Sequence, residues 1–176
     1  MIVIDLYGSP SSGKSTCAAY VFANLKMRGV KCELVTEVAK DLVWDENAKA
    51  LWNQAYVFGN QFYRLSRLQG HVDVAVTDSP LLLSILYNRC GMLGSNFYKV
   101  VSEVAKSFDS LSYFLPVIKH ASYDSTGRIH DECESSKLSD EVLRLLAMQN
   151  VEYKVLGHDK SSMMSIVDDV INALGK

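Results

Sequence analysis

Short runs of apolar and β-branched residues alternate along the chain with segments in which apolar residues recur every three or four positions. The runs are typical of buried strands, and the recurring positions are typical of amphipathic helices. Strands are predicted over residues 2–7, 32–36, 72–77, 112–118 and 152–156. This alternation predicts an α/β domain with a five-stranded, mainly parallel sheet between two layers of helices, a three-layer α/β/α arrangement.

Helical periodicity is clearest in two segments. Apolar residues share one face of a helix over residues 14–28, which Gly29 ends. A second set recurs through residues 47–68 and predicts one long helix there. Ser79 and Pro80 predict the cap and the first residue of another helix. Further helices are predicted over residues 97–108, 139–148 and 161–174.

Composition is that of one globular domain over residues 1–176, with 48% apolar and 22% charged residues. The formal net charge of −2 gives no overall attraction to nucleic acid, so such binding would need a local basic patch. The four cysteines form no C-x-x-C pair and predict reduced thiols rather than zinc ligands or disulfides. No leader precedes the first strand, and no apolar run approaches the ~18 residues of a membrane helix, so we expect a cytoplasmic protein that binds no membrane.

The first predicted strand leads directly into residues 8–16, GSPSSGKST. A strand followed by G-x-x-x-x-G-K-S/T predicts a P-loop, whose backbone N–H groups surround phosphate oxygens. Lys14 is expected to reach the β- and γ-phosphates and Ser15 to bind Mg²⁺. The chain is therefore expected to bind ATP and Mg²⁺. The predicted nucleotide-binding residues are Gly8, Ser11, Ser12, Gly13, Lys14, Ser15 and Thr16.

Absent motifs narrow the class of P-loop protein. GTPases read guanine with N-K-x-D after a strand, and the chain has no such stretch. Hydrolytic ATPases usually end their third strand with Asp-Glu, whereas this chain has Asp78-Ser79. A phosphotransferase remains, in which the attacking group is a substrate hydroxyl or phosphate rather than water.

Ligands of an open parallel sheet lie beyond the carboxyl ends of its strands, which places the P-loop, Glu37, Asp78 and the segment from Lys119 onward on one rim. Asp78 is predicted to hold Mg²⁺ or to act as a general base; alternatively, it supports the cap of the next helix. Glu37 is predicted to accept the proton of the acceptor hydroxyl; alternatively, it is an exposed glutamate at a helix start.

Residues 119–136 lack periodicity and are predicted to form a lid or loop. Arg128 within it is predicted to close over the transferred phosphoryl group, and the alternative is a solvated loop arginine. On the acceptor side, amides and aromatics flank the predicted long helix and could hydrogen-bond to a base or stack on it. The predicted substrate contacts are Glu37, Trp44, Gln54, Tyr56 and Gln61. An ordinary half-exposed helix face is the alternative, and Trp52 is expected to pack in the core.

Residues 8–16, 36–41 (TEVAKD), 53–56 (NQAY) and 76–80 (VTDSP) together resemble a family of small bacteriophage P-loop proteins, usually labelled AAA-family ATPase or kinase. Some members are similar to phage kinases that phosphorylate 5-hydroxymethyluracil within DNA. The TEVAKD stretch also resembles nicotinamide riboside kinases and deoxynucleoside kinases, in which a glutamate at the end of the second strand contacts the acceptor hydroxyl. The resemblance implies a P-loop kinase fold, Glu37 as the acceptor-side acid, and location in the infected host cytoplasm.

The resemblance has two departures. No arginine follows Asp78, unlike in many nucleoside kinases, and the basic lid of nucleoside monophosphate kinases is reduced mainly to Arg128. Three functions stay open at this point: a kinase of a modified pyrimidine in DNA, a kinase of free nucleosides or nucleoside monophosphates, and an ATP-binding regulatory switch without transfer. The acceptor, the general base and the oligomeric state, a homodimer included, are not decided by the sequence.

Overall fold

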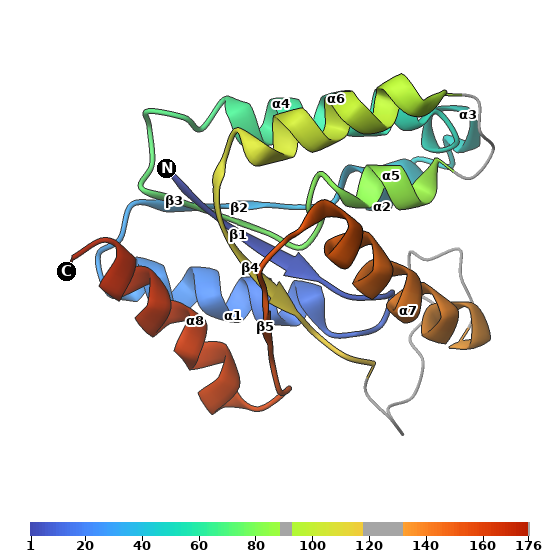
Figure 1. Cartoon of the computed structure of the whole chain (residues 1–176). Helices are drawn as coiled ribbons and strands as arrows, with labels where there is room; N and C mark the ends of the chain where they lie inside the picture. The colour runs from blue at the N-terminus through green and yellow to red at the C-terminus, as the bar shows by residue number, and fades with distance from the viewer. Residues whose placement is uncertain (89–92, 118–131, 176) are drawn as a thin grey trace.

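The computed structural model describes residues 1–88, 93–117 and 132–175. Its strands form one sheet in the order β2-β3-β1-β4-β5, with all four pairings parallel (Figure 1). The strands are β1 (Ile2–Tyr7), β2 (Cys32–Val35), β3 (Val74–Thr77), β4 (Asp109–Phe114) and β5 (Lys154–Val155). The predicted α/β class and five-stranded parallel sheet are confirmed.

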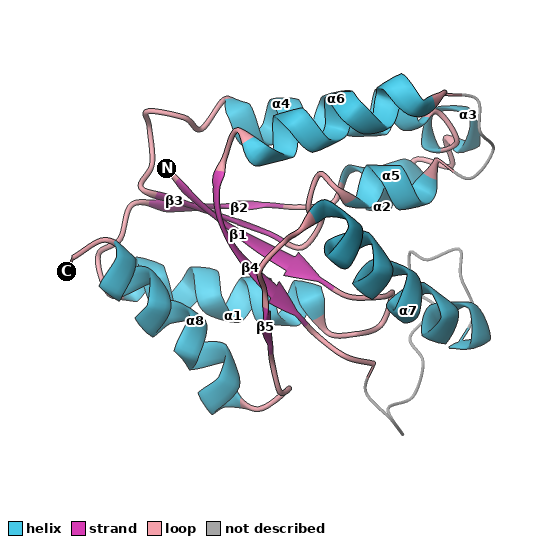
Figure 2. Cartoon of the chain, in the orientation of Figure 1, coloured by secondary structure: helices cyan, strands magenta, loops and turns pink. Residues whose placement is uncertain are grey.

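Helices cover both faces of the sheet (Figures 1 and 2). One face packs against α1 (Lys14–Met27) and α8 (Lys160–Ala173), and the other against α4 (Gln54–Ser66), α5 (Leu83–Tyr87), α6 (Ser95–Lys106) and α7 (Glu132–Gln149). Side chains of β1 alternate between these faces: Ile4 and Leu6 lie in the core under α1 and α8, and Val3 and Tyr7 lie in the other core. The predicted three-layer arrangement is confirmed.

Asp5 interrupts the apolar sequence of the central strand. By alternation it points to the same face as Val3 and Tyr7, the face that carries α4 to α7. Burial raises the pKa of Asp5 to about 7, although a hydrogen bond with Ser110 acts in the opposite direction. The raised pKa means that folding favours the protonated form of this carboxyl group.

The segment after β2 differs most from the sequence-based expectation. In place of one helix over residues 47–68, the chain forms α3 (Ala48–Leu51) and α4, preceded by α2 (Val38–Trp44), which was not predicted. Asn47 accepts a hydrogen bond from the Ala50 N–H at 3.2 Å, and Asn53 accepts one from the Tyr56 N–H at 3.1 Å. Each asparagine starts a new helix as its N-cap, which divides the predicted helix.

Other boundaries also differ. Ser79 does not cap a helix that begins at Pro80: its N–H binds Thr77 Oγ1 at 3.1 Å, and α5 begins at Leu83. The chain first forms a turn, in which the Leu83 N–H binds the Pro80 carbonyl at 3.0 Å. β4 begins at Asp109, because the pairing with β1 extends from that residue onward. Residues 132–136, predicted as loop, belong to α7.

No helix in the described ranges combines the length and the apolar character needed to span a membrane. Two of the four cysteines, Cys17 and Cys32, are buried with free thiols. Burial raises the pKa of Cys17 to about 12, so its thiol stays protonated at neutral pH.

Candidate functional site

A cavity of about 340 Å³ lies at the carboxyl ends of the central strands. Lys14 and Ser15, Glu37 and Asp78 all line it, so the structure brings together three of the segments that the sequence places on one rim. They meet because β1, β2 and β3 are parallel neighbours and end at the same edge of the sheet. The volume falls within the usual range of small-molecule sites, about 300–1,000 Å³.

The backbone of residues 8–16 has the conformation that a phosphate cradle needs. Gly8 has φ 147°, and a Cβ there would lie 2.6 Å from the Leu115 carbonyl oxygen and 2.5 Å from Ser12 Oγ, so only glycine fits. Gly13 is the N-cap of α1 in the left-handed region, φ 82°. It has no side chain with which to cap the helix, and no acidic residue occupies the first turn. The positive end of α1 therefore faces the cavity as an anion-binding element.

The predicted nucleotide-binding residues divide into two groups. Ser11, Gly13, Lys14, Ser15 and Thr16 line the cavity. Gly8 and Ser12 are not among its lining residues; Ser12 is fully buried, and its hydroxyl has no hydrogen-bond partner in the described part of the chain. Gly8 and Ser12 pack closely against each other within the loop.

Lys14 stabilises the loop in the conformation seen here. Its ammonium group donates to the carbonyl oxygens of Gly8 at 2.9 Å and Ser9 at 2.7 Å. Since Lys14 also lines the cavity, a bound phosphate would compete with these carbonyls for the same ammonium group.

The second acid of the predicted site is tied to the P-loop. Ser15 Oγ donates to Asp78 Oδ2 at 2.6 Å, across 63 residues of sequence. Asp78 is 7% exposed, and its other oxygen, Oδ1, is buried without a hydrogen-bond partner among the described residues. The alternative role of Asp78 as support for a cap after β3 finds no support, since α5 starts only at Leu83.

This pair fits a magnesium ion. A buried carboxylate oxygen without a partner is costly unless a cation or a donor reaches it, and hydroxyl and carboxylate oxygens are ligands that Mg²⁺ accepts. Within the described residues, no group of three or more His, Cys, Asp and Glu side chains could hold a metal by itself. Mg²⁺ would therefore take its remaining ligands from phosphate oxygens and water, as it usually does at phosphate sites.

Glu37 lies at the turn between β2 and α2. It is the N-cap residue of α2 in an extended conformation, φ −66° and ψ 123°, and its side chain makes no capping hydrogen bond. The residue is partly buried and lines the cavity, which distinguishes it from an exposed glutamate at a helix start. Asp41, one turn further along α2, lines a separate groove and pairs with Arg64.

The predicted acceptor contacts are only partly at the cavity. Gln54 and Gln61 line it, and Oε1 of Gln54 is buried without a hydrogen-bond partner in the described ranges. Trp44 and Tyr56 are 59% and 46% exposed and are not among the lining residues. Gln54 and Gln61 lie seven positions apart on α4 and share one face of it, whereas Tyr56, two positions after Gln54, lies on another face. The expected core packing of Trp52 was wrong: Trp52 is 58% exposed and lines the cavity.

Sequence reasoning missed the contribution of α5. Leu83, Ser84 and Tyr87 line the cavity from this short helix. The sequence does contain a signal for this contribution. Leu83 and Tyr87 are four positions apart and therefore lie on one face of a helix. The apolar part of the wall consists of Pro10, Ala39, Val43, Leu51, Val57, Pro80 and Leu83, together with Trp52.

Arg128, the remaining predicted catalytic residue, lies outside the described residues, as do residues 119–131 of the predicted lid. Comparison of the chain with protein-family models and with curated proteins found no match.

Proposed function

We propose that the protein is an ATP- and Mg²⁺-dependent phosphotransferase that acts on a hydroxyl group of a nucleoside-like acceptor. The observation that carries this proposal is the Ser15–Asp78 pair, in the same cavity as residues 8–16 and Glu37. One carboxylate oxygen of the pair has no partner among the described residues. A phosphate cradle, a metal-binding pair and a separate carboxylate are the groups that phosphoryl transfer to an alcohol requires.

On the donor side, Lys14 and the N–H groups at the start of α1 would hold the β- and γ-phosphates of ATP. Ser15 and Asp78 would hold Mg²⁺, which neutralises charge that develops on the phosphate oxygens. Glu37 would accept the proton as the acceptor oxygen attacks the γ-phosphorus and the bond to the β-phosphate oxygen breaks. The products are the phosphorylated acceptor and ADP.

The acceptor side favours a ring that carries a hydrogen-bond donor. Apolar side chains and Trp52 supply contact surface, and Oε1 of Gln54 is a buried acceptor without a partner in the described residues. An N–H group on a pyrimidine ring would satisfy that oxygen, whereas an apolar ligand would leave it unpaired at a cost of about 1–3 kcal/mol. Pyrimidine nucleosides meet both requirements.

In the most specific form of the proposal, the acceptor is the 5-hydroxymethyl group of 5-hydroxymethyluracil in phage DNA, which the family resemblance implies. A base in a duplex would have to leave the stack to reach the cavity, with Trp52 as a surface on which it could stack. The second candidate is a free nucleoside or nucleoside monophosphate, which the cavity volume of about 340 Å³ accommodates without DNA.

The deciding experiment incubates the protein with γ-labelled ATP and Mg²⁺ against free nucleosides, deoxynucleoside monophosphates, unmodified DNA and 5-hydroxymethyluracil DNA, with Lys14→Ala as the inactive control. Label only in the modified DNA supports the DNA-base kinase. Label in a nucleoside or monophosphate supports the second candidate. ATP binding without transfer to any acceptor contradicts the proposal and favours a regulatory switch.

A further inference from the structure

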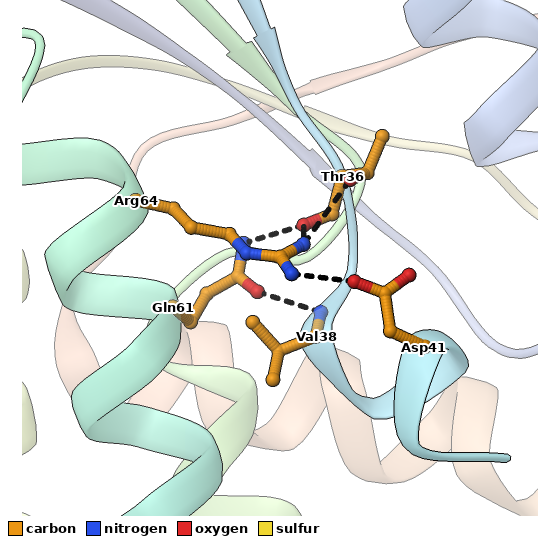
Figure 3. A network of polar contacts seen from close by, with 5 residues as sticks. All are labelled: Thr36, Val38, Asp41, Gln61 and Arg64. Carbon is orange, nitrogen blue, oxygen red and sulfur yellow. Dashed lines mark hydrogen bonds and ion pairs between the residues drawn. The ribbon is translucent and has the colours of Figure 1, made fainter. Parts of the chain in front are cut away.

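The two peptide groups on either side of Glu37 are bonded to one side chain of α4, that of Gln61 (Figure 3). Gln61 Nε2 donates to the Thr36 carbonyl at 3.3 Å, and Gln61 Oε1 accepts from the Val38 N–H at 3.0 Å. Gln61 is 5% exposed. Because both ends of its amide are engaged with the β2–α2 turn, Gln61 restrains the backbone angles of Glu37 from both sides.

The bond between Val38 and Gln61 satisfies the first N–H donor of α2. Val38 is the first residue of α2, and its N–H has no partner within the helix. A cap residue normally accepts hydrogen bonds from the first turn through its own side chain, but Glu37 makes no such bond. Gln61 accepts from the N–H of Val38, a position that a cap side chain does not normally reach, and Glu37 lines the cavity.

Arg64 binds the same turn (Figure 3). It lies three positions after Gln61 on α4, and its Nη1 donates to the carbonyl and the hydroxyl of Thr36, each at 3.2 Å. Its Nη2 forms an ion pair with Asp41. The Arg64 and Asp41 side chains are 31% and 49% exposed, so water screens this ion pair much more than it screens the hydrogen bonds of Gln61.

We propose that Gln61 is a positioning residue for Glu37, and that it acts through the backbone of the β2–α2 turn rather than by contact with the acceptor. This assignment rests on the proposed function of Glu37 as the acid that receives the acceptor proton. It replaces the substrate contact expected for Gln61 from the sequence. A shift of a catalytic group by about 1 Å can cost ~10²-fold in rate, so the loss of both hydrogen bonds is expected to be visible in turnover.

Gln61→Met tests the assignment, because methionine keeps the length and the apolar stem of glutamine but makes neither bond. Gln69→Met is the matched control, since Gln69 is exposed in the turn after α4. The first readout is hydrogen exchange at the Val38 N–H, which does not depend on any activity. We expect faster exchange in Gln61→Met and wild-type exchange in Gln69→Met; wild-type exchange in both would overturn the proposal.

The second readout separates positioning from a general loss of stability. We expect kcat for phosphoryl transfer to fall about 10- to 100-fold in Gln61→Met, with ATP affinity unchanged. In a Glu37→Gln background the same substitution is expected to cause no further loss, because Gln61 acts through Glu37. Equal losses in both backgrounds, or an unchanged kcat, would overturn the positioning role.

Two further outcomes are distinguishable. If Gln61→Met does not fold, Gln61→Leu replaces it: leucine is apolar, smaller and makes neither bond, so a similar fall in kcat is expected and an unchanged kcat overturns the role. A wild-type protein that transfers no phosphoryl group would overturn the proposed function and the positioning role together. The hydrogen-exchange measurement at the Val38 N–H would then show by itself whether Gln61 restrains the backbone of the turn.

Discussion

The two sides of the cavity are built in different ways. The proposed donor side consists mainly of nine consecutive residues, 8–16. Lys14 binds carbonyls only five and six positions away, and the bond from Ser15 to Asp78 ties the loop to β3. The acceptor side brings together Glu37 after β2, Gln54 and Gln61 on α4, and Tyr87 on α5. Its hydrogen bonds join residues 23 to 28 positions apart.

The two sides of the cavity therefore have different structural requirements. The donor side depends on backbone conformations that a few residue types permit, such as glycine at position 8, where any Cβ would clash. The acceptor side depends on side chains that reach the backbone of another element, such as Gln61 at the β2–α2 turn. A substitution on the proposed donor side is therefore expected to remove a phosphate contact directly. A substitution on the proposed acceptor side is expected to act by displacing a neighbouring group, and the following predictions test this difference.

The largest effect is expected for Lys14→Ala. Loss of the ammonium group removes a charge from the transferring phosphates and two hydrogen bonds from the loop, so transfer is expected to fall at least ~10³-fold. Label transfer from γ-labelled ATP measures it. Lys26→Ala is the control, because Lys26 lies on the same helix but pairs with Glu33 at the surface. Transfer near the wild-type rate would contradict the donor-side assignment.

On the acceptor side, Glu37→Gln keeps the shape of the side chain and removes the proton acceptor. Transfer is expected to fall about 10²- to 10⁴-fold while the dissociation constant for ATP stays within twofold of the wild type. Equilibrium binding and label transfer measure the two quantities. Glu33→Gln, on the exposed side of the preceding strand, is the matched control. Equal weakening of ATP binding by Glu37→Gln would place Glu37 on the donor side.

Asp5→Asn tests the effect of the buried carboxyl group in the central strand β1. The pKa of Asp5 is about 7 in the folded protein, against an ordinary value of 3.8. Its contribution to stability is therefore fully present below about pH 4 and is lost as the pH rises through about 7. At pH 8 the asparagine variant is expected to be more stable by about 2 kcal/mol. Urea unfolding at pH 5 and pH 8 measures this, and an unchanged pH dependence in the variant would contradict the role of Asp5.

Asp78→Asn addresses the residue that connects the P-loop to β3. The amide keeps an oxygen near Ser15 but lacks the charge, so the Mg²⁺ concentration at half-maximal transfer is expected to rise about tenfold. A magnesium titration of transfer measures it. Asp109→Asn, at the exposed start of β4, serves as the control. An unchanged titration would count against Asp78 as a metal ligand.

The smallest effect is expected for Trp52→Ala, which tests the placement of the aromatic residues. Trp52 lines the cavity, whereas Trp44 does not. Trp52→Ala is expected to raise the KM for the acceptor about fivefold, equivalent to ~1 kcal/mol of stacking, and Trp44→Ala to leave it unchanged. Acceptor saturation curves of both variants decide it. The reverse result would favour the stacking role that the sequence predicts for Trp44.

The sequence predicted the fold class well because its signals are local. Apolar runs and helical periodicity identified the strands and the helices that cover them, and the order of these elements implied a parallel sheet. It failed over residues 47–68, where Asn47 and Asn53 fit the polar flank of one long helix but act as N-caps of two. Whether an asparagine caps a helix or continues it is decided by packing, which periodicity does not describe.

The sequence by itself determined the P-loop, since residues 8–16 are contiguous and their glycines meet backbone requirements that few other residues satisfy. It also placed Glu37 and Asp78 after strands, and therefore on one edge of a parallel sheet. Only the tertiary structure decided that Gln61 binds the Glu37 turn, that Asp41 pairs with Arg64, and that Trp52 rather than Trp44 lines the cavity. These outcomes depend on how α2, α3 and α4 pack against each other, and contacts between separate helices leave no periodic trace in the sequence.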